Sequence, residues 1–347
     1  MSSDRETIDG TTPGQEERDR KAEHIHLALE ERMQVPLHPF DRYFFTPNAL
    51  PEIDRSEIDL QIPFLGHQLR APLLISCMTG GTDLATKINR RLATAAEELG
   101  IAVGVGSQRK AIEEPALAAS FAVREFAPSV PILANLGAVQ LNYGFGLDEC
   151  RAAVEMIGAD ALVFHLNPLQ EAIQPEGQCD FSGLLGKMGE IADRLNVPVI
   201  AKEVGSGISA TTARQLQGVG IEIVDCAGVG GTSWALIEAA RAADPDIGDL
   251  YGDWGIPTPE NIRDLRQVPG IQIIGSGGIR TGLDAAKAMA LGAHFVGMAR
   301  PFLEAAMEST AAVVARAQRT IRELEVAMFC TGARTIEALR GSELRSR

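Results

Sequence analysis

The sequence predicts an α/β protein, a (β/α)8 TIM barrel with an N-terminal helical and hairpin extension. Eight short apolar runs recur along the 347 residues, and segments with helical patterns lie between them. Alternation of strand and helix is typical of a parallel sheet with right-handed crossovers. Eight such units favour a closed barrel, and an open doubly wound sheet is the alternative.

Local patterns predict the individual elements. Residues 84–99 are rich in Ala, Leu and Glu and are followed by Gly100, a typical residue just beyond a helix C-terminus. The apolar runs fit parallel strands that are covered on both faces. The eight predicted strands span residues 72–79, 101–108, 131–137, 161–167, 197–204, 221–228, 271–278 and 293–300. The other predicted helices span residues 147–157, 181–195, 211–217, 259–268 and 282–291.

The chain divides into four predicted segments. They are a disordered tail at 1–17, a helix and hairpin at 18–71, the barrel at 72–320 and a helical tail at 321–347. The tail at 1–17 is expected to be disordered because its apolar content is low.

Three segments outside the regular strand and helix units have predicted structures. Residues 58–69 form two strand-like halves around Gly66, which predicts a hairpin that plugs the bottom of the barrel. Residues 18–35 predict a helix that carries several basic side chains. The longest connection, 229–257, is expected to be an active-site loop with a helix over 234–243, because loops of this length are usually functional or mobile.

Composition excludes several classes of protein. A net charge of −14 argues against nucleic-acid binding, which requires a basic surface. No apolar run reaches about 18 residues, and the N-terminus has no signal-peptide core, so we expect no membrane segment and a cytoplasmic location. The five cysteines form no CxxC pair, which indicates neither a zinc site nor a disulfide framework. Cys77 and Cys226 lie in apolar runs and are expected to be inert core residues.

A polar cluster follows the fourth predicted strand. It runs from His165 to Glu171 and contains an imidazole, two amides and a carboxylate within seven residues. In barrel enzymes, the C-terminal ends of the strands form the face where chemistry takes place. The sequence therefore predicts that this cluster belongs to the active site.

The last two strands predict a phosphate site. Glycine-rich segments follow them at 275–280 and 297–301, and barrels often bind phosphate there through backbone N–H groups. Arg280 or Arg300 could add a charged donor; tight turns without a ligand are the alternative. Lys202 lies in an apolar strand and could face an anionic partner such as the N1–C2=O edge of a reduced flavin. An ion pair of this lysine with a barrel carboxylate such as Glu203 is the alternative.

Nine motifs, in order along the chain, resemble the FMN-dependent type 2 isopentenyl diphosphate isomerases. The resemblance runs from Arg20 to about Leu303, and the extended N-terminus before Arg20 is the main departure. The motifs are Arg20-Lys21-Ala22-Glu23-His24, Met78-Thr79-Gly80-Gly81, Gly106-Ser107-Gln108-Arg109, Asn135-Leu136-Gly137, His165-Leu166-Asn167-Pro168-Leu169-Gln170-Glu171, Lys202-Glu203-Val204-Gly205, Gly230-Gly231-Thr232-Ser233-Trp234, Ser276-Gly277-Gly278-Ile279-Arg280 and Gly297-Met298-Ala299-Arg300-Pro301.

The resemblance implies interconversion of isopentenyl and dimethylallyl diphosphate, with reduced FMN, Mg2+ and NADPH as the reductant, in a homo-oligomer (tetramer or octamer). It implies that FMN contacts Met78, Thr79, Gly80, Ser107, Asn135, Lys202, Thr232, Gly277, Gly278, Ile279, Ala299 and Arg300. It implies that the substrate contacts Arg20, Lys21, Ser107, Gln108, Arg109 and Gln170. It implies that Glu171 binds Mg2+.

Gln170 and His165 are the candidate catalytic side chains. Gln170 is a poor acid, so it is expected to position the alkene or relay a proton, while the reduced flavin or a side chain donates the proton. His165 could be a base or could only orient a neighbour. Three structural alternatives remain: His165 as a hydrogen-bonding core residue, Glu171 as a helix N-terminal charge, and Arg20 and Lys21 as a solvated helix face.

An FMN-dependent hydroxy-acid oxidase on the same barrel is the alternative function. Such an oxidase needs a histidine beside an arginine after the sixth strand, where this chain has no histidine between Asp225 and Gly231. A nucleotide dehydrogenase would need a nucleophilic cysteine in that loop, but Cys226 is expected inside the strand. A non-catalytic binding module would leave the Gln170–Glu171 pair unexplained.

Overall fold

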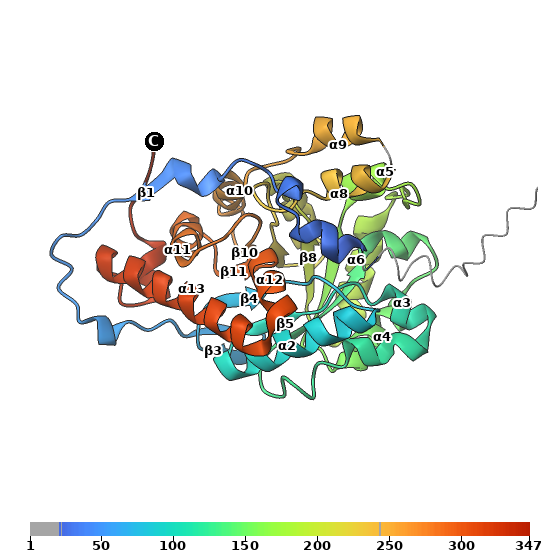
Figure 1. Ribbon diagram of the computed structural model, residues 1–347, viewed down its shortest axis with the longest axis horizontal. Helices are drawn as coiled ribbons and strands as arrows, with labels where there is room; N and C mark the ends of the chain where they lie inside the picture. Colours follow the sequence, from blue (N-terminus) through green and yellow to red (C-terminus); the bar gives the residue numbers. More distant parts are fainter. Residues whose placement is uncertain (1–20, 22, 243) are drawn as a thin grey trace, which may run out of the picture.

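The computed structural model describes residue 21 and residues 23–242 and 244–347. Eight parallel strands form a closed barrel, which confirms the predicted fold class (Figure 1). All eight predicted strands are present, in sequence order around the barrel. They are β4 (Leu73–Ile75), β5 (Ala102–Gly104), β6 (Ile132–Gly137), β7 (Ala161–Leu166), β8 (Val199–Glu203), β9 (Ile223–Asp225), β10 (Gln272–Gly275) and β11 (Phe295–Met298).

Most strands are shorter than their apolar runs predict. β4 ends at Ile75, although the predicted strand continued to residue 79. Ser76 still donates its N–H to the carbonyl of Met298 in β11, and residues 76–80 line a cavity at the C-terminal ends of the strands, the upper mouth of the barrel. Apolar content therefore marks the strands correctly, but it does not mark the point where a strand becomes a functional loop.

The helices alternate with the strands as predicted. α2 begins after Thr82, whose side chain accepts from the N–H of Ala85, and it ends at Gly100 in the left-handed conformation, with a φ of +66°. The barrel helices are α2 (Asp83–Leu99), α3 (Arg109–Glu113), α4 (Leu147–Ile157), α5 (Pro168–Ile173), α6 (Leu184–Arg194), α7 (Ala210–Gln217), α8 (Trp234–Ala242), α9 (Pro245–Tyr251), α10 (Thr258–Leu265), α11 (Gly282–Leu291) and α12 (Arg300–Glu308).

The hairpin formed by β2 (Ile62–Phe64) and β3 (His67–Leu69) closes the bottom of the barrel, as predicted. Phe64 and Leu69 belong to the same buried cluster as inward-facing side chains of the strands, among them Ile274 and Phe295. The rings of Phe64 and Phe295 lie 4.4 Å apart between centroids. This end of the barrel is therefore filled by apolar side chains.

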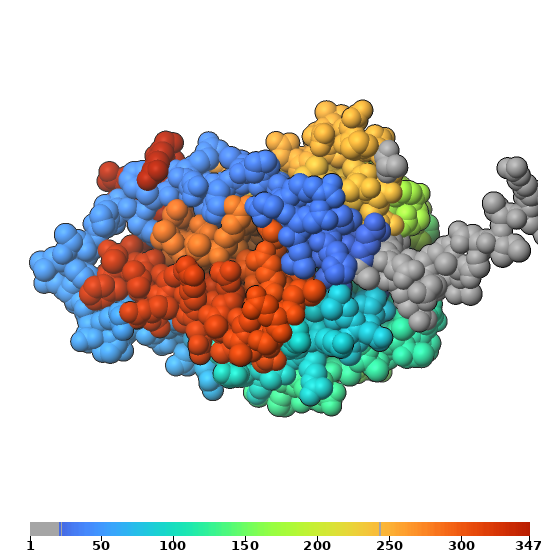
Figure 2. All heavy atoms as spheres, viewed as in Figure 1, coloured from blue at the N-terminus to red at the C-terminus, as the bar shows by residue number. Residues whose placement is uncertain are grey.

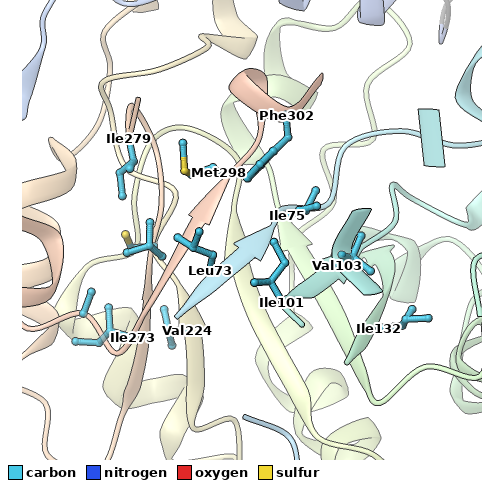
Figure 3. Close-up of a cluster of buried hydrophobic side chains, with 14 of the residues drawn as sticks. Leu73, Ile75, Ile101, Val103, Ile132, Val224, Ile273, Ile279, Met298 and Phe302 are labelled. Atoms are coloured by element: carbon cyan, nitrogen blue, oxygen red, sulfur yellow. The ribbon is translucent and has the colours of Figure 1, made fainter. Parts of the chain in front are cut away.

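A second, larger core lies between the strands and the surrounding helices. Figure 3 shows Ile75 of β4 beside Phe302 of α12, with Val103 of β5 on the other side of Ile75. All three side chains are buried, and they belong to one cluster that runs around the barrel. Because each strand presents alternate side chains to the barrel interior and to the helices, both faces of the sheet are covered by apolar contacts.

The C-terminal strand pairs with a strand of the N-terminal extension in a small sheet. β1 (Tyr43–Phe45) pairs antiparallel with β12 (Leu344–Ser346), beside the C-terminus in Figure 1. The tail predicted to be helical contains α13 (Thr310–Thr331) and α14 (Ile336–Arg340) before this strand. α13 continues through the predicted boundary between residues 320 and 321 and packs on α2 and α11, so it belongs to the outer layer of the barrel.

The N-terminal segment lies across the upper mouth of the barrel. Residues 23–29 are helical and are followed by the short 3-10 helix Glu31–Met33, within the predicted helix of 18–35. Figure 2 shows this blue segment between the gold α8–α9 region and the orange-red C-terminal helices. The predicted tail at 1–17 lies outside the described residues. None of the described helices is both long and apolar enough to cross a bilayer.

Candidate active site

A cavity of about 540 Å³ opens at the C-terminal ends of the barrel strands. The segments that follow all eight strands contribute to its lining, together with the N-terminal helix and α12. This volume lies within the usual range for cofactor and small-molecule sites. The cavity is therefore on the face of the barrel where the sequence predicted chemistry.

The structure brings nearly all predicted site residues to this cavity. Those that line it are Lys21, Met78, Thr79, Gly80, Ser107, Arg109, Asn135, His165, Gln170, Glu171, Lys202, Thr232, Gly277, Gly278, Ile279, Ala299 and Arg300. Arg20 lies outside the described residues.

Gln108 is the exception among the described residues, because its side chain does not line the cavity. The side chain is fully buried, and its amide donates to the carbonyl of Ala153 in α4 at 2.8 Å. Its Oε1 accepts from the N–H of Asn135 at 2.9 Å. The Gln108 side chain thus holds β6 in place from behind the site, rather than facing a ligand.

The end of β7 and the start of α5 position Gln170 and Glu171. Asn167 donates to Oε1 of Gln170 at 3.1 Å and to Oε1 of Glu171 at 2.9 Å. The other carboxylate oxygen of Glu171 accepts from the N–H of Gln178 at 2.7 Å. Both side chains lie in the first turn of α5 and line the cavity, so the amide and the carboxylate are presented together.

Glu238 of α8 does not line the cavity but holds Gln170 from behind, and the sequence analysis missed it. Its fully buried carboxylate accepts from the Gln170 amide at 2.8 Å, and it lies 3.1 Å from Nε2 of His24 in the N-terminal helix. Arg241 also pairs with Glu238, at 2.5 Å. A glutamate four residues after Trp234, on the apolar face of a predicted helix, is the signal that could have identified it.

His165 is held as a neutral imidazole. Its Nδ1 lies 2.9 Å from Oδ1 of Asn135, which fits Nδ1 as the donor and leaves Nε2 as an acceptor. Burial, together with the positive charges of Lys202 and Arg109, lowers the pKa of His165 from 6.5 to about 3. At neutral pH this side chain can accept a hydrogen bond at Nε2 or orient a neighbour, but it cannot be a protonated acid.

Lys202 and Glu203 stand at the end of β8 and have different partners. Nζ of Lys202 donates to the backbone carbonyl of Glu203 at 2.5 Å, and the lysine lines the cavity. The Glu203 carboxylate instead accepts from the four successive N–H groups of residues 204–207. The ion pair between these two side chains is therefore not formed. The alternative of another barrel carboxylate stays open, because the register of β8 and β9 places Asp225 beside Lys202.

The cavity walls near β4, β10 and β11 fit FMN. Gly277 and Gly278 have φ values of +99° and +70°, and a Cβ on either would meet the backbone of the β9 loop, so glycine is required at both positions. α12 begins at the cavity, but Pro301 has no N–H and the N–H groups of Phe302 and Leu303 donate to the carbonyl of Ala299, so the start of this helix offers few free donors. Ser76 Oγ is buried at the cavity and has no hydrogen-bond partner among the described residues.

Metal binding would depend on few protein ligands. The described part of the chain contains no group of three or more His, Cys, Asp or Glu side chains that could hold a metal ion. Glu171 offers one carboxylate at the cavity, beside the cationic side chains of Lys21, Arg109 and Lys110. Mg2+ commonly uses one or two carboxylates and completes its shell with substrate phosphate and water oxygens, so the residues present fit that pattern.

The thiols near the cavity are not nucleophiles. Burial raises the pKa of Cys77 to about 11 and that of Cys226 to about 12. A thiolate at neutral pH is therefore disfavoured at both positions. Cys226 is buried as predicted, although it directly follows β9 instead of lying within the strand. Cys77 is only partly buried and lines the cavity, so its assignment to the core was wrong.

Comparison with known proteins identifies the family. Residues 27–126 and 176–346 match the family model described as FMN-dependent dehydrogenase. An isopentenyl-diphosphate delta-isomerase from a Nostoc species is 50% identical over 338 residues, which cover 96% of this chain and 97% of that protein. One from a Synechococcus species is 51% identical over 327 residues, covering 92% and 94%.

Solved structures support the fold alone. A mandelate oxidase variant with an FMN adduct aligns with a TM-score of 0.63 over 94% of this chain and 92% of that one, at 19% identity. At this identity the likeness extends to the barrel and not to the reaction. The family model supports FMN as the cofactor of the cavity. By its sequence the chain belongs to the isopentenyl-diphosphate delta-isomerases, built on the barrel of the FMN-dependent dehydrogenases.

Proposed function

We propose that this chain interconverts isopentenyl diphosphate and dimethylallyl diphosphate, using reduced FMN and Mg2+. One observation carries the proposal: a single cavity joins the glycine-lined wall that fits FMN to the Gln170–Glu171 pair and three cationic side chains. The negative charge of a diphosphate requires cationic side chains. The part of the substrate with the carbon–carbon double bond requires an uncharged surface beside the flavin ring. Relatives named isopentenyl-diphosphate delta-isomerase match this chain over almost their whole length, which supports the same reaction.

Reduced FMN, kept in that state by NADPH, would supply the electron-rich ring beside which the alkene exchanges protons. Met78, Asn135, Lys202, Gly277 and Arg300 are among the residues that would hold it. The net reaction is redox-neutral, so the protein's task is to bind, orient and exclude water.

The diphosphate end of the substrate would bind at Lys21, Arg109 and Lys110, with Arg20 as a further candidate. Charge-assisted hydrogen bonds from these side chains would fix its position. Glu171 would hold Mg2+ against the phosphate oxygens. Its carboxylate is already oriented by Asn167 and by the N–H of Gln178, so little reorganisation would be needed on binding.

The hydrocarbon end of the substrate would lie beside Gln170. This side chain donates its amide hydrogen to Glu238, and its Oε1 accepts from Asn167, so its orientation is fixed from both sides. Gln170 would position the alkene or relay a proton. Neutral His165 would keep its proton on Nδ1, directed to Asn135, and would present Nε2 as a hydrogen-bond acceptor.

Hydroxy-acid oxidation is less well supported. The likeness to mandelate oxidase is confined to the fold, and the segment after β9, from Cys226 to Trp234, contains no histidine that could act as a base. Hydroxy-acid oxidation would not require the cationic side chains proposed to bind diphosphate or the Gln170–Glu171 pair.

An assay of the purified protein separates these functions. With FMN, NADPH and Mg2+ under anaerobic conditions, isopentenyl diphosphate should be converted to dimethylallyl diphosphate until the two reach equilibrium. Oxygen consumption with lactate or glycolate, and no isomerisation, would contradict the proposal. Bleaching of the oxidised flavin spectrum by NADPH tests the reductant separately.

Assembly and location complete the proposal. We expect a homo-oligomer, either a tetramer or an octamer, which light scattering of the purified protein would test. A cytoplasmic location is expected as well, and cell fractionation with an antibody to the chain would test it.

A further inference from the structure

Asp225 is a buried charge in the barrel that the proposed function does not use. It ends β9 after the apolar residues Ile223 and Val224, and its side chain is 2% exposed. Burying an ionised carboxylate is costly unless opposite charge or hydrogen bonds compensate. A carboxylate at the end of a barrel strand therefore requires a partner.

Lys202 is that partner. The parallel register of β8 and β9 sets Asp225 directly beside Lys202. The lysine lines the cavity. Burial raises the pKa of Asp225, and the positive charge of Lys202 offsets this rise only in part. Both charges also act on the thiol of Cys77, so they face the same region between β4 and β9.

Hydrogen bonds fix the Asp225 carboxylate. Ser276 Oγ, at the end of β10, donates to Oδ1 of Asp225, and the same Oγ accepts from the N–H of Ala227 at 3.2 Å. Ala227 lines the cavity in the left-handed region, with a φ of +36°, which a residue other than glycine rarely adopts. The carboxylate is therefore fixed by Ser276, at the end of the neighbouring strand β10.

The other ionisable groups around Lys202 do not balance its charge in the same way. The Glu203 carboxylate is directed to four backbone N–H groups of its own loop. His165 is neutral at physiological pH, because its pKa is lowered to about 3. Arg109 adds a further positive charge that acts on His165. Among these groups, Asp225 is the carboxylate that the strand register places beside the lysine.

We propose that Asp225 is a positioning residue that, through Lys202, limits how strongly the cavity stabilises the negative charge of reduced FMN. Reduction of a flavin adds negative charge to its N1–C2=O edge, and a lysine at the cavity favours that charge. A carboxylate beside the lysine offsets part of this effect. The inference depends on the proposed function only in that FMN occupies this cavity.

The midpoint potential of bound FMN tests the proposal. Asp225→Asn keeps the shape of the side chain and an acceptor for Ser276 but removes the charge. We expect the potential to rise, so that the ratio of reduced to oxidised FMN at a fixed potential increases about tenfold, or about 30 mV for a two-electron couple. Titration against dyes of known potential measures this shift, whether or not the protein isomerises isopentenyl diphosphate.

A double-mutant cycle assigns the shift to Lys202. In a Lys202→Met background, Asp225→Asn should change the potential much less, because the charge through which it acts is gone. An unchanged potential in the single variant, or an equal shift in both backgrounds, would overturn the proposal. Asp225→Ser provides a second neutral side chain. If neither variant folds and binds FMN, Asp225 serves the stability of β9 instead, and the proposal is wrong.

Discussion

The two ends of one barrel differ in how they use the same eight strands. At the lower end, Phe64 and Leu69 of the hairpin fill the interior together with side chains such as Phe295. At the upper end, Lys202 and Asp225 occupy neighbouring strands beside a cavity. The strands therefore carry stability at one end and chemistry at the other, as is general in this fold.

The polar groups at the two ends differ in whether they have hydrogen-bond partners within the protein. At the lower end, Asp160 accepts from Arg124 at 2.6 Å and from the N–H of Ile132 at 2.8 Å, and it lies 3.1 Å from His67. At the upper end, Ser76 Oγ and Asn167 Oδ1 are buried at the cavity without a hydrogen-bond partner among the described residues. Unpaired buried polar atoms are costly, which indicates that this end is complete only with its ligands.

The largest expected effect is at the upper end. Glu171→Gln removes the proposed Mg2+ ligand but keeps an acceptor for Asn167 and Gln178. We expect isomerase activity to fall roughly 10³-fold, about 4 kcal/mol in the transition state, with little change in thermal stability. Activity measured across a Mg2+ titration is the readout.

Glu176→Gln is the matched control, since Glu176 lies five residues further on and pairs with Arg241 instead. We expect it to keep most of the activity. A Glu171→Gln protein as active as the parent at low Mg2+ would exclude the metal role.

At the lower end, Phe64→Ala should cost stability and little activity. Removing a buried ring leaves a cavity beside Phe295, and the expected loss in the free energy of unfolding is about 3–4 kcal/mol. Denaturant unfolding measures it. Phe44→Ala is the control, because Phe44 is 37% exposed and its truncation should change stability by about 0.5 kcal/mol or less. A large loss of activity in folded Phe64→Ala would contradict the assignment of stability to the lower end and chemistry to the upper end.

Asp160→Asn should have a smaller effect at the same end. Burial would raise the pKa of Asp160. Hydrogen bonds from the backbone N–H of Ile132 and from the side chains of Arg124 and His67 outweigh this effect and lower the pKa below 3.8. The carboxylate therefore stabilises the fold above its unfolded pKa, and this contribution is lost as the pH falls through the folded value. We expect the variant to lose about 1–2 kcal/mol at pH 7, since these bonds are partly exposed, and less at pH 3. An equal loss at both pH values would contradict the ionic role.

The smallest expected effect concerns His294, just before β11. Burial and the charge of Arg340 lower its pKa from 6.5 to about 4. Since the unfolded state takes up a proton first, stability present above pH 6.5 is lost as the pH falls toward 4. Between pH 7 and 5.5 we expect a loss of about 1 kcal/mol or less after solvent screening. Thermal unfolding of His294→Gln should show a flatter pH dependence; an unchanged slope would assign the acid sensitivity to other groups.

The sequence predicted the lower end almost completely. The hairpin around Gly66 and the eight apolar runs depend on local periodicity and turn residues, which are readable without long-range contacts. The predictions failed where a contact across the fold decides the structure. β12 pairs with β1 through residues about 300 positions apart, so the tail that was expected to be helical ends in a strand.

At the upper end, sequence motifs predicted which residues belong to the site, but not how their side chains are directed. The motifs located Gln170 and Glu171, but they did not distinguish Gln108, whose amide faces α4 and β6, from its neighbours that face the cavity. Glu238 was missed for the same reason. Its role depends on the packing of α8 against α5, which brings residues 68 positions apart into hydrogen-bond contact.

The sequence by itself determined the barrel, the hairpin at its lower end and the set of residues around the site, because hydrophobic periodicity and turn chemistry are local. Only the tertiary structure decided which side chains share the cavity and which charges oppose each other. The register of β8 and β9 places Asp225 beside Lys202, although 23 residues separate them. Electrostatic interactions depend on distance in space and on burial, and neither is recorded in the order of the residues.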